Sequence, residues 1–144
     1  MDIRTVLRTK GSQVETVTPD TLIPDVCQKM RVKGVGALVV SRDGQHVDGI
    51  ISERDVVLGV AHDGFAALKS TAAHLMSSHV VTCGLDDHLT KVMSVITNQR
   101  VRHVPVVEAG RLAGIISIGD VLKARLSEIQ LEADVLRDMH LAGQ

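Results

Sequence analysis

Aromatic side chains are nearly absent from this chain of 144 residues, which contains one phenylalanine, Phe65, and neither tyrosine nor tryptophan. Proteins that bind single-stranded nucleic acid commonly stack its bases on aromatic rings, so the chain lacks the side chains for this mode of binding. An excess of charge of one sign is also missing, because 16 basic and 17 acidic residues leave a net charge of −1. A nucleic-acid partner or a membrane partner is therefore not expected.

Long apolar runs and cysteine frameworks are missing as well. No stretch of 18 apolar residues occurs, and no cationic leader precedes an apolar segment at the N-terminus. The two cysteines, Cys27 and Cys83, are too few for a disulfide framework, and Cys27 falls on the apolar face of an expected helix as a small buried side chain. We expect a soluble, cytoplasmic protein whose core needs no disulfide bond.

Motifs that indicate catalysis are not found in the sequence. The seven histidines follow no metal-ligand spacing such as HExxH, and neither a nucleophile elbow nor a phosphate-binding GxxxxGKS loop occurs. We therefore expect no metal ion, no catalytic cofactor and no enzymatic activity.

The sequence does contain nearly the same heptad twice, GIISERD at residues 49–55 and GIISIGD at residues 114–120, which are 65 residues apart. An alignment that places Leu38 against Pro105 extends the repeat back to Thr16 and Cys83, at a constant separation of 67 residues. The difference of two residues then falls in the turn before each heptad. Internal repetition of this kind indicates two similar structural units.

Each unit shows the same order of patterns. Apolar residues at helical spacing come first and are followed by a short β-type run, at 37–40 or 103–107. A turn at Asp43-Gly44 or Ala109-Gly110 leads into a strand that ends in GIIS, and a helix is expected to begin at the serine. Each unit therefore predicts the order β-α-β-β-α.

These patterns predict an α+β fold in which tandem β-α-β-β-α repeats are related by pseudo-twofold symmetry and have their sheets packed together. We place the first repeat at residues 1–68, the second at 69–126 and a C-terminal helical extension at 127–144. Asp20 and Asp87 lie near the expected N-cap of the first helix of each repeat.

The heptad itself allows two interpretations. Ser52 with Asp55, and Ser117 with Asp120, match a capping box, in which serine and acid bond each other's backbone at a helix start. The same place also brings free backbone N–H groups, a hydroxyl and a carboxylate together, and a carboxylate there can accept hydrogen bonds from the vicinal hydroxyls of a ribose. Both interpretations remain open from the spacing alone.

The two heptads, together with the VRHVPVV stretch at residues 101–107, resemble the signature of CBS domains, and the resemblance covers about residues 14–124. It implies a regulatory, energy-sensing module rather than an enzyme. Proteins of this family bind AMP, ADP, ATP, NAD(H) or S-adenosylmethionine in clefts between two repeats and signal to a regulated partner protein. By position, Asp55 and Asp120 would hold the ribose hydroxyls, with Ser52 and Ser117 beside the ribose or phosphate.

The resemblance further implies that basic side chains ahead of the proline of one repeat meet the phosphate held at the other repeat. Arg102 and His103 hold these positions, and Arg100 and Arg54 are expected to lie near the same cleft. The alignment at 67 residues sets Val35 and Gly36 against Arg102 and His103, so the Asp55 cleft is predicted to bind the phosphorylated ligand more strongly than the Asp120 cleft.

Two further possibilities concern charge at these clefts. Arg100 and Arg102 can instead alternate along a strand and simply face water. Lys10 and Lys33 are long enough to reach the Asp120 cleft and supply the charge that it lacks.

Four valines are candidates for the adenine pocket, and each is equally well explained as core: Val14, Val17, Val80 and Val81.

The last helix carries an apolar stripe that continues past the second repeat, formed by Leu122, Leu126, Ile129, Ala133 and Leu136. A stripe beyond the repeat favours contact with a second copy of the chain, so a homodimer is expected. The alternative function is a structural or interaction dimer without a nucleotide ligand, in which the heptads are capping boxes only.

Overall fold

The computed structural model describes residues 1–143, and so the predicted C-terminal extension is described except for Gln144. Its helices are α1 (Ile3–Lys10), α2 (Ile23–Lys33), α3 (Glu53–Asp63), the 3-10 helix η1 (Gly64–Lys69), α4 (Ala72–Leu75), α5 (Leu89–Gln99) and α6 (Ile118–Ala142). Its strands are β1 (Thr16–Val17), β2 (Ala37–Val40), β3 (Gly49–Ser52), β4 (His103–Glu108) and β5 (Arg111–Ser117).

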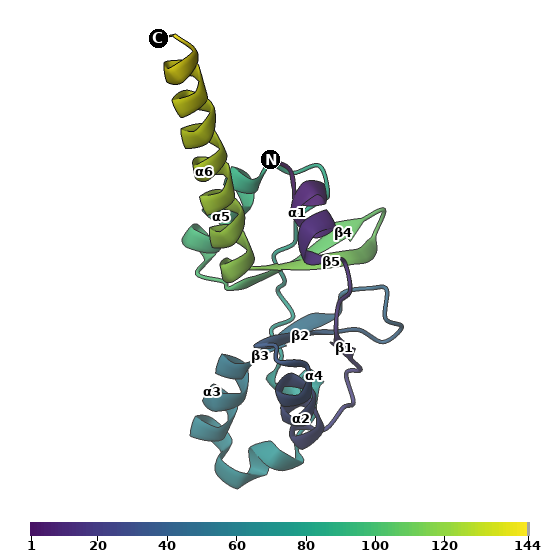
Figure 1. Cartoon of the computed structure of the whole chain (residues 1–144). Helices are drawn as coiled ribbons and strands as arrows, with labels where there is room; N and C mark the ends of the chain where they lie inside the picture. Colours follow the sequence, from purple (N-terminus) through teal and green to yellow (C-terminus); the bar gives the residue numbers. More distant parts are fainter. Residues whose placement is uncertain (144) are drawn as a thin grey trace.

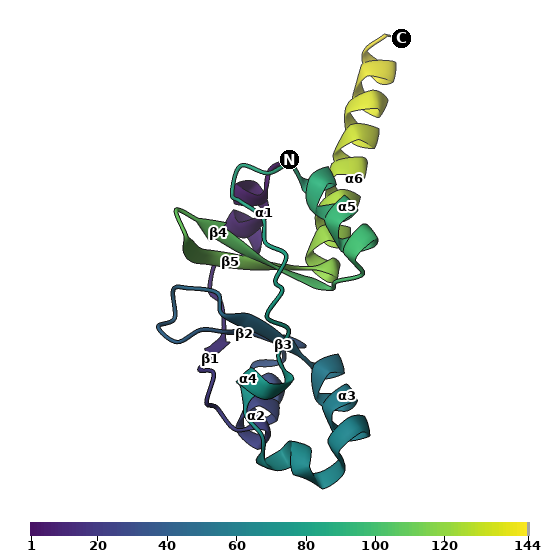
Figure 2. The ribbon, with the colours of Figure 1, turned by 180° about the vertical axis from the view of Figure 1, so that it is seen from behind.

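Two small sheets lie at the centre of the molecule, with helices on their outer faces (Figures 1 and 2). The first sheet has the order β1-β2-β3, with β1 parallel and β3 antiparallel to β2, and α2, α3 and α4 cover it. The second is the antiparallel pair β4-β5, covered by α1, α5 and α6. The Leu112 N–H donates to the Gln45 carbonyl oxygen (2.6 Å), joining the two repeats. The predicted α+β architecture is confirmed, except that the first strand of the second repeat is reduced to a parallel bridge between Cys83 and Val106.

Each repeat has its own apolar core. The first is built from β1, α2, β2 and β3, and its fully buried side chains are Ile23, Val26, Leu38, Val40, Ile51 and Ala72. The second is built from α5, β4, β5 and α6, and its fully buried side chains are Ile3, Leu89, Val92, Val104, Val106 and Ile116.

The two repeats exchange the segments that precede them in the sequence. α1 leads the first repeat, yet Ile3, Val6 and Leu7 are buried in the second core. Ala72 of α4 leads the second repeat, yet it is buried in the first core. The boundary at residues 68 and 69 remains a prediction about the repeating sequence units, because packing crosses it in both directions.

The repeats superimpose in a register one residue away from the predicted one. α2 and α5 correspond at a separation of 66 residues, as do their C-caps, Gly34 and Arg100. The antiparallel pair Val40–Gly49 corresponds to the pair Val106–Gly114. The 67-residue alignment was therefore wrong, because apolar strand residues match one another equally well at either separation. Arg102 and His103 correspond to Gly36 and Ala37.

Several local predictions are confirmed and one is wrong. β2 has the predicted bounds 37–40, and Ala109 and Gly110 form the β4–β5 turn with φ values of 51° and 77°. The N-caps are Leu22 and His88 rather than Asp20 and Asp87. The two aspartates instead fix the preceding turns, since Asp20 accepts from the Thr18 hydroxyl (2.5 Å) and Asp87 from the Gly84 N–H (2.8 Å).

Arg100 ends α5 in the left-handed conformation, with φ 54° and ψ 36°, where the first repeat has Gly34 at φ 66° and ψ 36°. Arg100 is therefore a helix C-cap, and β4 begins only at His103, so the predicted alternation of Arg100 and Arg102 along a strand was wrong. A side chain with a Cβ is disfavoured in this conformation, which glycine adopts without penalty.

We expect Arg100→Gly to raise the free energy of unfolding by about 1 kcal/mol, because it relieves the left-handed strain at this cap. Urea denaturation of the ligand-free protein measures the change. Arg102→Gly is the matched control, since it removes the same charge two residues away at a residue with negative φ, and it is expected to give no gain. A less stable Arg100→Gly protein would contradict the assignment of strain.

Candidate functional site

The two heptads form matching joints between a strand and a helix. Ser52 is the N-cap of α3, where its hydroxyl accepts from the Asp55 N–H (3.3 Å) and the Asp55 carboxylate accepts from the Ser52 N–H (2.8 Å). Ser117 and Asp120 repeat this arrangement at the start of α6, at 3.2 Å and 2.8 Å. Both capping boxes expected from the spacing are therefore formed.

Capping uses only one oxygen of each carboxylate. The Ser52 N–H and hydroxyl both donate to Asp55 Oδ2, and the Ser117 N–H and hydroxyl both donate to Asp120 Oδ2. Within residues 1–143, no hydrogen bond reaches Oδ1 of either aspartate. Each carboxylate therefore retains an oxygen that can accept from a ligand hydroxyl, so the capping and binding interpretations are compatible.

The glycine that opens each heptad lies against a segment from the other repeat. A Cβ on Gly114 would lie 2.7 Å from Leu7 Cδ1, on α1. A Cβ on Gly49 would overlap the Met76 side chain and lie 3.0 Å from the Ser77 carbonyl oxygen. The exchanged segments therefore pack directly on the backbone of β3 and β5, three residues before the candidate serines.

α3 and α6 leave the two sheets at the same edge of the molecule and run in opposite directions (Figure 1). His103 lies at this junction: it pairs with Ser117 across β4 and β5, and its ring is 3.7 Å from the position of a Cβ on Gly36. Burial lowers the pKa of His103, the Lys10 charge lowers it further, and the carboxylates of Asp120 and Glu53 oppose these effects. His103 is thus influenced by charged groups at the starts of both α3 and α6.

The two aspartates differ in their cationic neighbours. The Lys10 ammonium, at the end of α1, donates to Asp120 Oδ2 and to the Ile115 carbonyl oxygen. Burial raises the pKa of Asp120, but hydrogen bonds from Lys10 and Ser117 outweigh it and hold the pKa below its ordinary value. Asp55 is bonded only by Ser52 among the described residues. Lys10 was expected to be able to reach this site, and the structure places it there.

The remaining basic candidates are not gathered around Asp55. Arg54, Arg100 and Arg102 are exposed, and the Arg102 carbonyl oxygen accepts from the Ile118 N–H (2.9 Å) at the start of α6. Lys33 forms an ion pair with Glu15 (3.8 Å) instead of approaching Asp120. The role of the arginines in holding a phosphate stays a prediction.

The valines predicted for adenine binding have different environments. Val17 is a buried member of the first core, which agrees with the alternative that it serves packing. Val14, Val80 and Val81 are half-buried, in the segments that approach β1 and its counterpart near Cys83.

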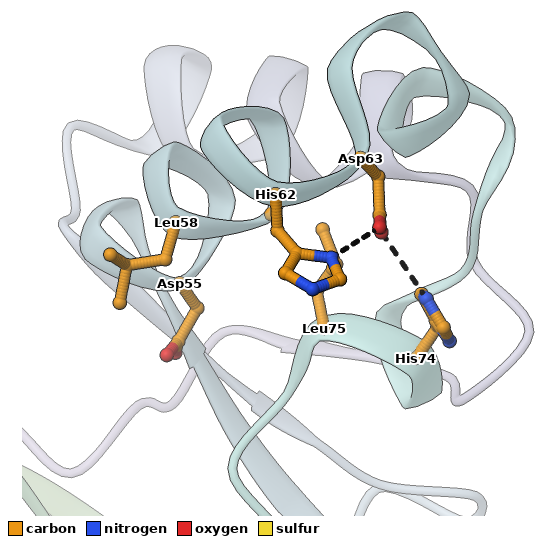
Figure 3. Close-up of a pocket in the computed structure, with 7 residues that line it drawn as sticks. Asp55, Leu58, His62, Asp63, His74 and Leu75 are labelled. Carbon is orange, nitrogen blue, oxygen red and sulfur yellow. Dashed lines mark hydrogen bonds and ion pairs between the residues drawn. The ribbon is translucent and has the colours of Figure 1, made fainter.

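Two pockets lie in the first repeat, and the exchanged α4 contributes to one of them. Asp55 lines one of about 370 Å³ between α3 and α4, together with His62, Asp63 and His74 (Figure 3). There the Asp63 carboxylate contacts the rings of His62 (2.6 Å) and His74 (3.5 Å). No sequence pattern predicts this group, because His74 reaches Asp63 only through the exchange of α4.

The second pocket, of about 470 Å³, lies between α2 and α3. Its lining includes Val35, Gly36 and Glu53, and also Cys27, which was expected to be buried and is half-buried against the first core. Both volumes fall in the range of small-molecule sites.

Two general features of residues 1–143 bear on the choice of ligand. Their histidine, cysteine and acidic side chains form no group of three or more with the placement needed to hold a metal ion. None of their helices combines the length and apolar character needed to cross a lipid bilayer.

Comparison with known proteins gives the family of both repeats. Residues 3–62 and 72–127 each match the CBS domain. The CBS-domain containing protein ATU1752 of Agrobacterium tumefaciens has a crystal structure that superimposes with a TM-score of 0.83 at 44% identity, covering 87% of this chain and 99% of that one. The mitochondrial CBS domain-containing protein CBSX3 of Arabidopsis thaliana is 30% identical over 134 residues, or 88% of this chain. The present chain spans about two thirds of CBSX3, since the match covers 65% of it.

A crystal structure of CBSX2 in complex with AMP has the same fold, with a TM-score of 0.69 at 24% identity over 79% of this chain and 88% of that one.

The lowered pKa of His103 predicts how stability depends on pH. An unperturbed histidine titrates near pH 6.5, so the unfolded chain takes up the proton before the folded chain does. The contribution of His103 to the free energy of unfolding is therefore fully present above about pH 6.5. It is lost as the pH falls through the lower pKa that His103 has in the folded protein. The difference in free energy of unfolding between wild type and His103→Gln is expected to shrink between pH 8 and pH 5. His79→Gln, at an exposed residue, is the control, and a difference that grows on acidification would contradict the prediction.

Proposed function

The chain belongs to the CBS-domain family, and we propose that it is a non-catalytic regulatory module that binds an adenosine-containing nucleotide and transmits its presence to a partner protein. One observation carries the proposal: each repeat presents an aspartate at a helix N-terminus with one oxygen used for capping and the other available. A carboxylate oxygen of this kind can accept hydrogen bonds from the two vicinal hydroxyls of a ribose.

We assign the ribose to Asp55 and Asp120, with Ser52 and Ser117 beside the ribose or the first phosphate. Backbone N–H groups at the starts of α3 and α6 favour a nearby anion. The basic candidates for the remaining phosphate charge are Arg54, Arg100, Arg102 and His103. Val14, Val17, Val80 and Val81 remain the candidates for contact with the adenine ring.

AMP is the first ligand to test, because it occupies the CBSX2 structure, which shares this fold. ADP, ATP, NAD(H) and S-adenosylmethionine carry the same adenosine group and follow as further candidates. Binding of any of them would report cellular energy or cofactor state. We propose a cytoplasmic location for this role; the relative CBSX3 is described as mitochondrial.

Transmission of the signal follows from linkage. A ligand that contacts groups from both repeats stabilises the relative arrangement in which those contacts form, and by the same amount favours any partner that prefers this arrangement. The exchanged α1 and α4 connect each candidate site to the opposite repeat. A ligand-induced movement at the start of α3 can therefore be transmitted to the start of α6, and the reverse.

We further propose that the protein acts as a homodimer that uses α6. Its stripe residues Leu122, Leu126, Ile129 and Leu136 are between 47% and 66% exposed, so the chain itself does not cover them. The family match ends at residue 127, while α6 continues to Ala142 and projects beyond the rest of the molecule (Figures 1 and 2).

A structural dimer without a nucleotide is the second candidate function. It is favoured by the complete capping boxes, which give Ser52, Asp55, Ser117 and Asp120 a sufficient role in folding.

Thermal unfolding with a panel of nucleotides distinguishes the two functions. AMP at 100 times its dissociation constant is expected to add about 2.7 kcal/mol to the native state, which raises the midpoint by several degrees. The shift is expected to be absent with GMP and largely lost in Asp55→Asn, because the amide replaces an acceptor oxygen and its charge at the ribose.

Each variant is compared with its own ligand-free midpoint, since weakening the cap lowers stability by itself. Ser52→Ala, which removes the capping hydroxyl but keeps Asp55, is expected to retain part of the shift. Equal shifts in wild type and Asp55→Asn would contradict the ribose assignment, and no shift with any adenine ligand would favour the structural dimer.

The dimer is tested by placing a charge in the stripe. Leu126→Glu is expected to weaken self-association at least tenfold, because burying a leucine contributes about 1.5–3 kcal/mol and a buried carboxylate costs more. Sedimentation equilibrium measures the dissociation constant of the dimer. Leu131→Glu is the matched control: Leu131 is also 66% exposed but lies about 140° around the helix from Leu126. Equal dissociation of the two variants, or none, would contradict a dimer through this stripe.

A further inference from the structure

The contact between Lys10 and Asp120 places a cation from α1 in one of the two candidate sites. We propose that Lys10 is an internal counter-ion that balances the charge of Asp120, weakens the hydrogen bonds that this carboxylate can accept from ribose hydroxyls, and so makes the second site the weaker one. This inference rests on the proposed assignment of Asp120 to a ribose, and it adds a residue that determines which site is filled.

Asp120 is already fully engaged on one side. Its Oδ2 accepts from the Ser117 N–H, the Ser117 hydroxyl and the Lys10 ammonium. The Lys10 and Asp120 side chains are only 27% and 22% exposed, so water screens their attraction less than it screens a surface pair. A ribose hydroxyl at the remaining oxygen, Oδ1, would therefore meet a carboxylate whose charge the ammonium already balances, so its hydrogen bond would be weaker than one made to Asp55.

Lys10 is held at this position by a rigid element. The α1 residues Ile3, Val6 and Leu7 are buried in the second core, and Leu7 lies against Gly114 in the heptad. Two backbone hydrogen bonds tie the start of the helix to the same repeat: Ile3 N–H to the Asp87 carbonyl (3.0 Å) and Arg4 N–H to the Leu85 carbonyl (2.9 Å). The ammonium is therefore presented by the folded core.

Within residues 1–143, no lysine or arginine bonds Asp55 at the first site. The segment that covers Gly49, in the place that α1 takes at Gly114, presents the Met76 side chain. Among the described residues Asp55 accepts hydrogen bonds only from Ser52. The inequality expected from the distribution of arginines thus has a second physical source, which is the direct neutralisation of Asp120.

The Lys10 side chain can leave without unfolding α1. It is the last residue of the helix, and Gly11 follows it at φ 103°, where the chain turns away toward β1. Removal of the ammonium alone is therefore expected to free the Asp120 carboxylate while the fold is kept.

Isothermal titration with AMP tests the inference in a background without the first site. Asp55→Asn is expected to bind AMP weakly, and Asp55→Asn/Lys10→Met at least tenfold more tightly, with one site per chain. Adding Asp120→Asn to the double variant is expected to abolish the gain. Lys29→Met is the control in the same background, because Lys29 is also a partly buried lysine that bonds a carboxylate and a backbone carbonyl, at Glu15 and Thr16.

Each outcome decides between the claims. If wild type binds AMP and Lys10→Met brings no gain in the Asp55→Asn background, the counter-ion role is overturned while the proposed function stands. If Lys10→Met weakens binding there, Lys10 is a ligand-binding group and the inference is also overturned. If wild type fails to bind but the double variant binds, Lys10 is confirmed and the Asp55 assignment fails. No binding by any variant overturns both.

Discussion

The reciprocal exchange of leading segments is the constraint on which both candidate sites depend. Each heptad begins with a glycine because a segment from the other half of the sequence lies directly against the backbone there. Met76 lies against Gly49 in β3, and Leu7 lies against Gly114 in β5. A methyl group at either glycine would push the segment away and disturb the strand that carries the binding aspartate. The repeated glycine is therefore explained by packing between the repeats, without any ligand.

The same reasoning applies to the rest of the heptad. Its isoleucines supply core contacts, such as the fully buried Ile51 and Ile116, and its serine and aspartate cap the following helix. Packing and capping therefore account for four of the five residues that the two copies share, while the first isoleucine of each copy, Ile50 or Ile115, is only half-buried. What folding does not require is that the carboxylates keep Oδ1 available or that the two joints differ in charge. These two features, rather than the repetition, support a binding function.

A structural feature can be predicted from this sequence when residues close together in the chain determine it, and not when it depends on contacts between distant segments. β2, the Ala109-Gly110 turn and the two capping boxes follow from neighbouring residues, and they were predicted within a residue. The register between repeats was wrong by one, because valine-rich strands give no preference between the two alignments. The contact of His74 with Asp63 depends on the exchange of α4, which no local pattern indicates. Side-chain length alone made both Lys10 and Lys33 candidates for the Asp120 site, and the exchange of α1 is what selects Lys10.

Communication between the two joints requires groups that respond to both. His103 is one, because its ring is influenced by Asp120 at the start of α6 and by Glu53 at the start of α3. Lys10 is another, since it belongs to the segment before the first repeat but bonds the second. A ligand that draws Lys10 away from Asp120 also removes a positive charge that acts on His103. The charges at the junction are thus coupled through space, and occupancy of one site can alter the other without a large movement of the backbone.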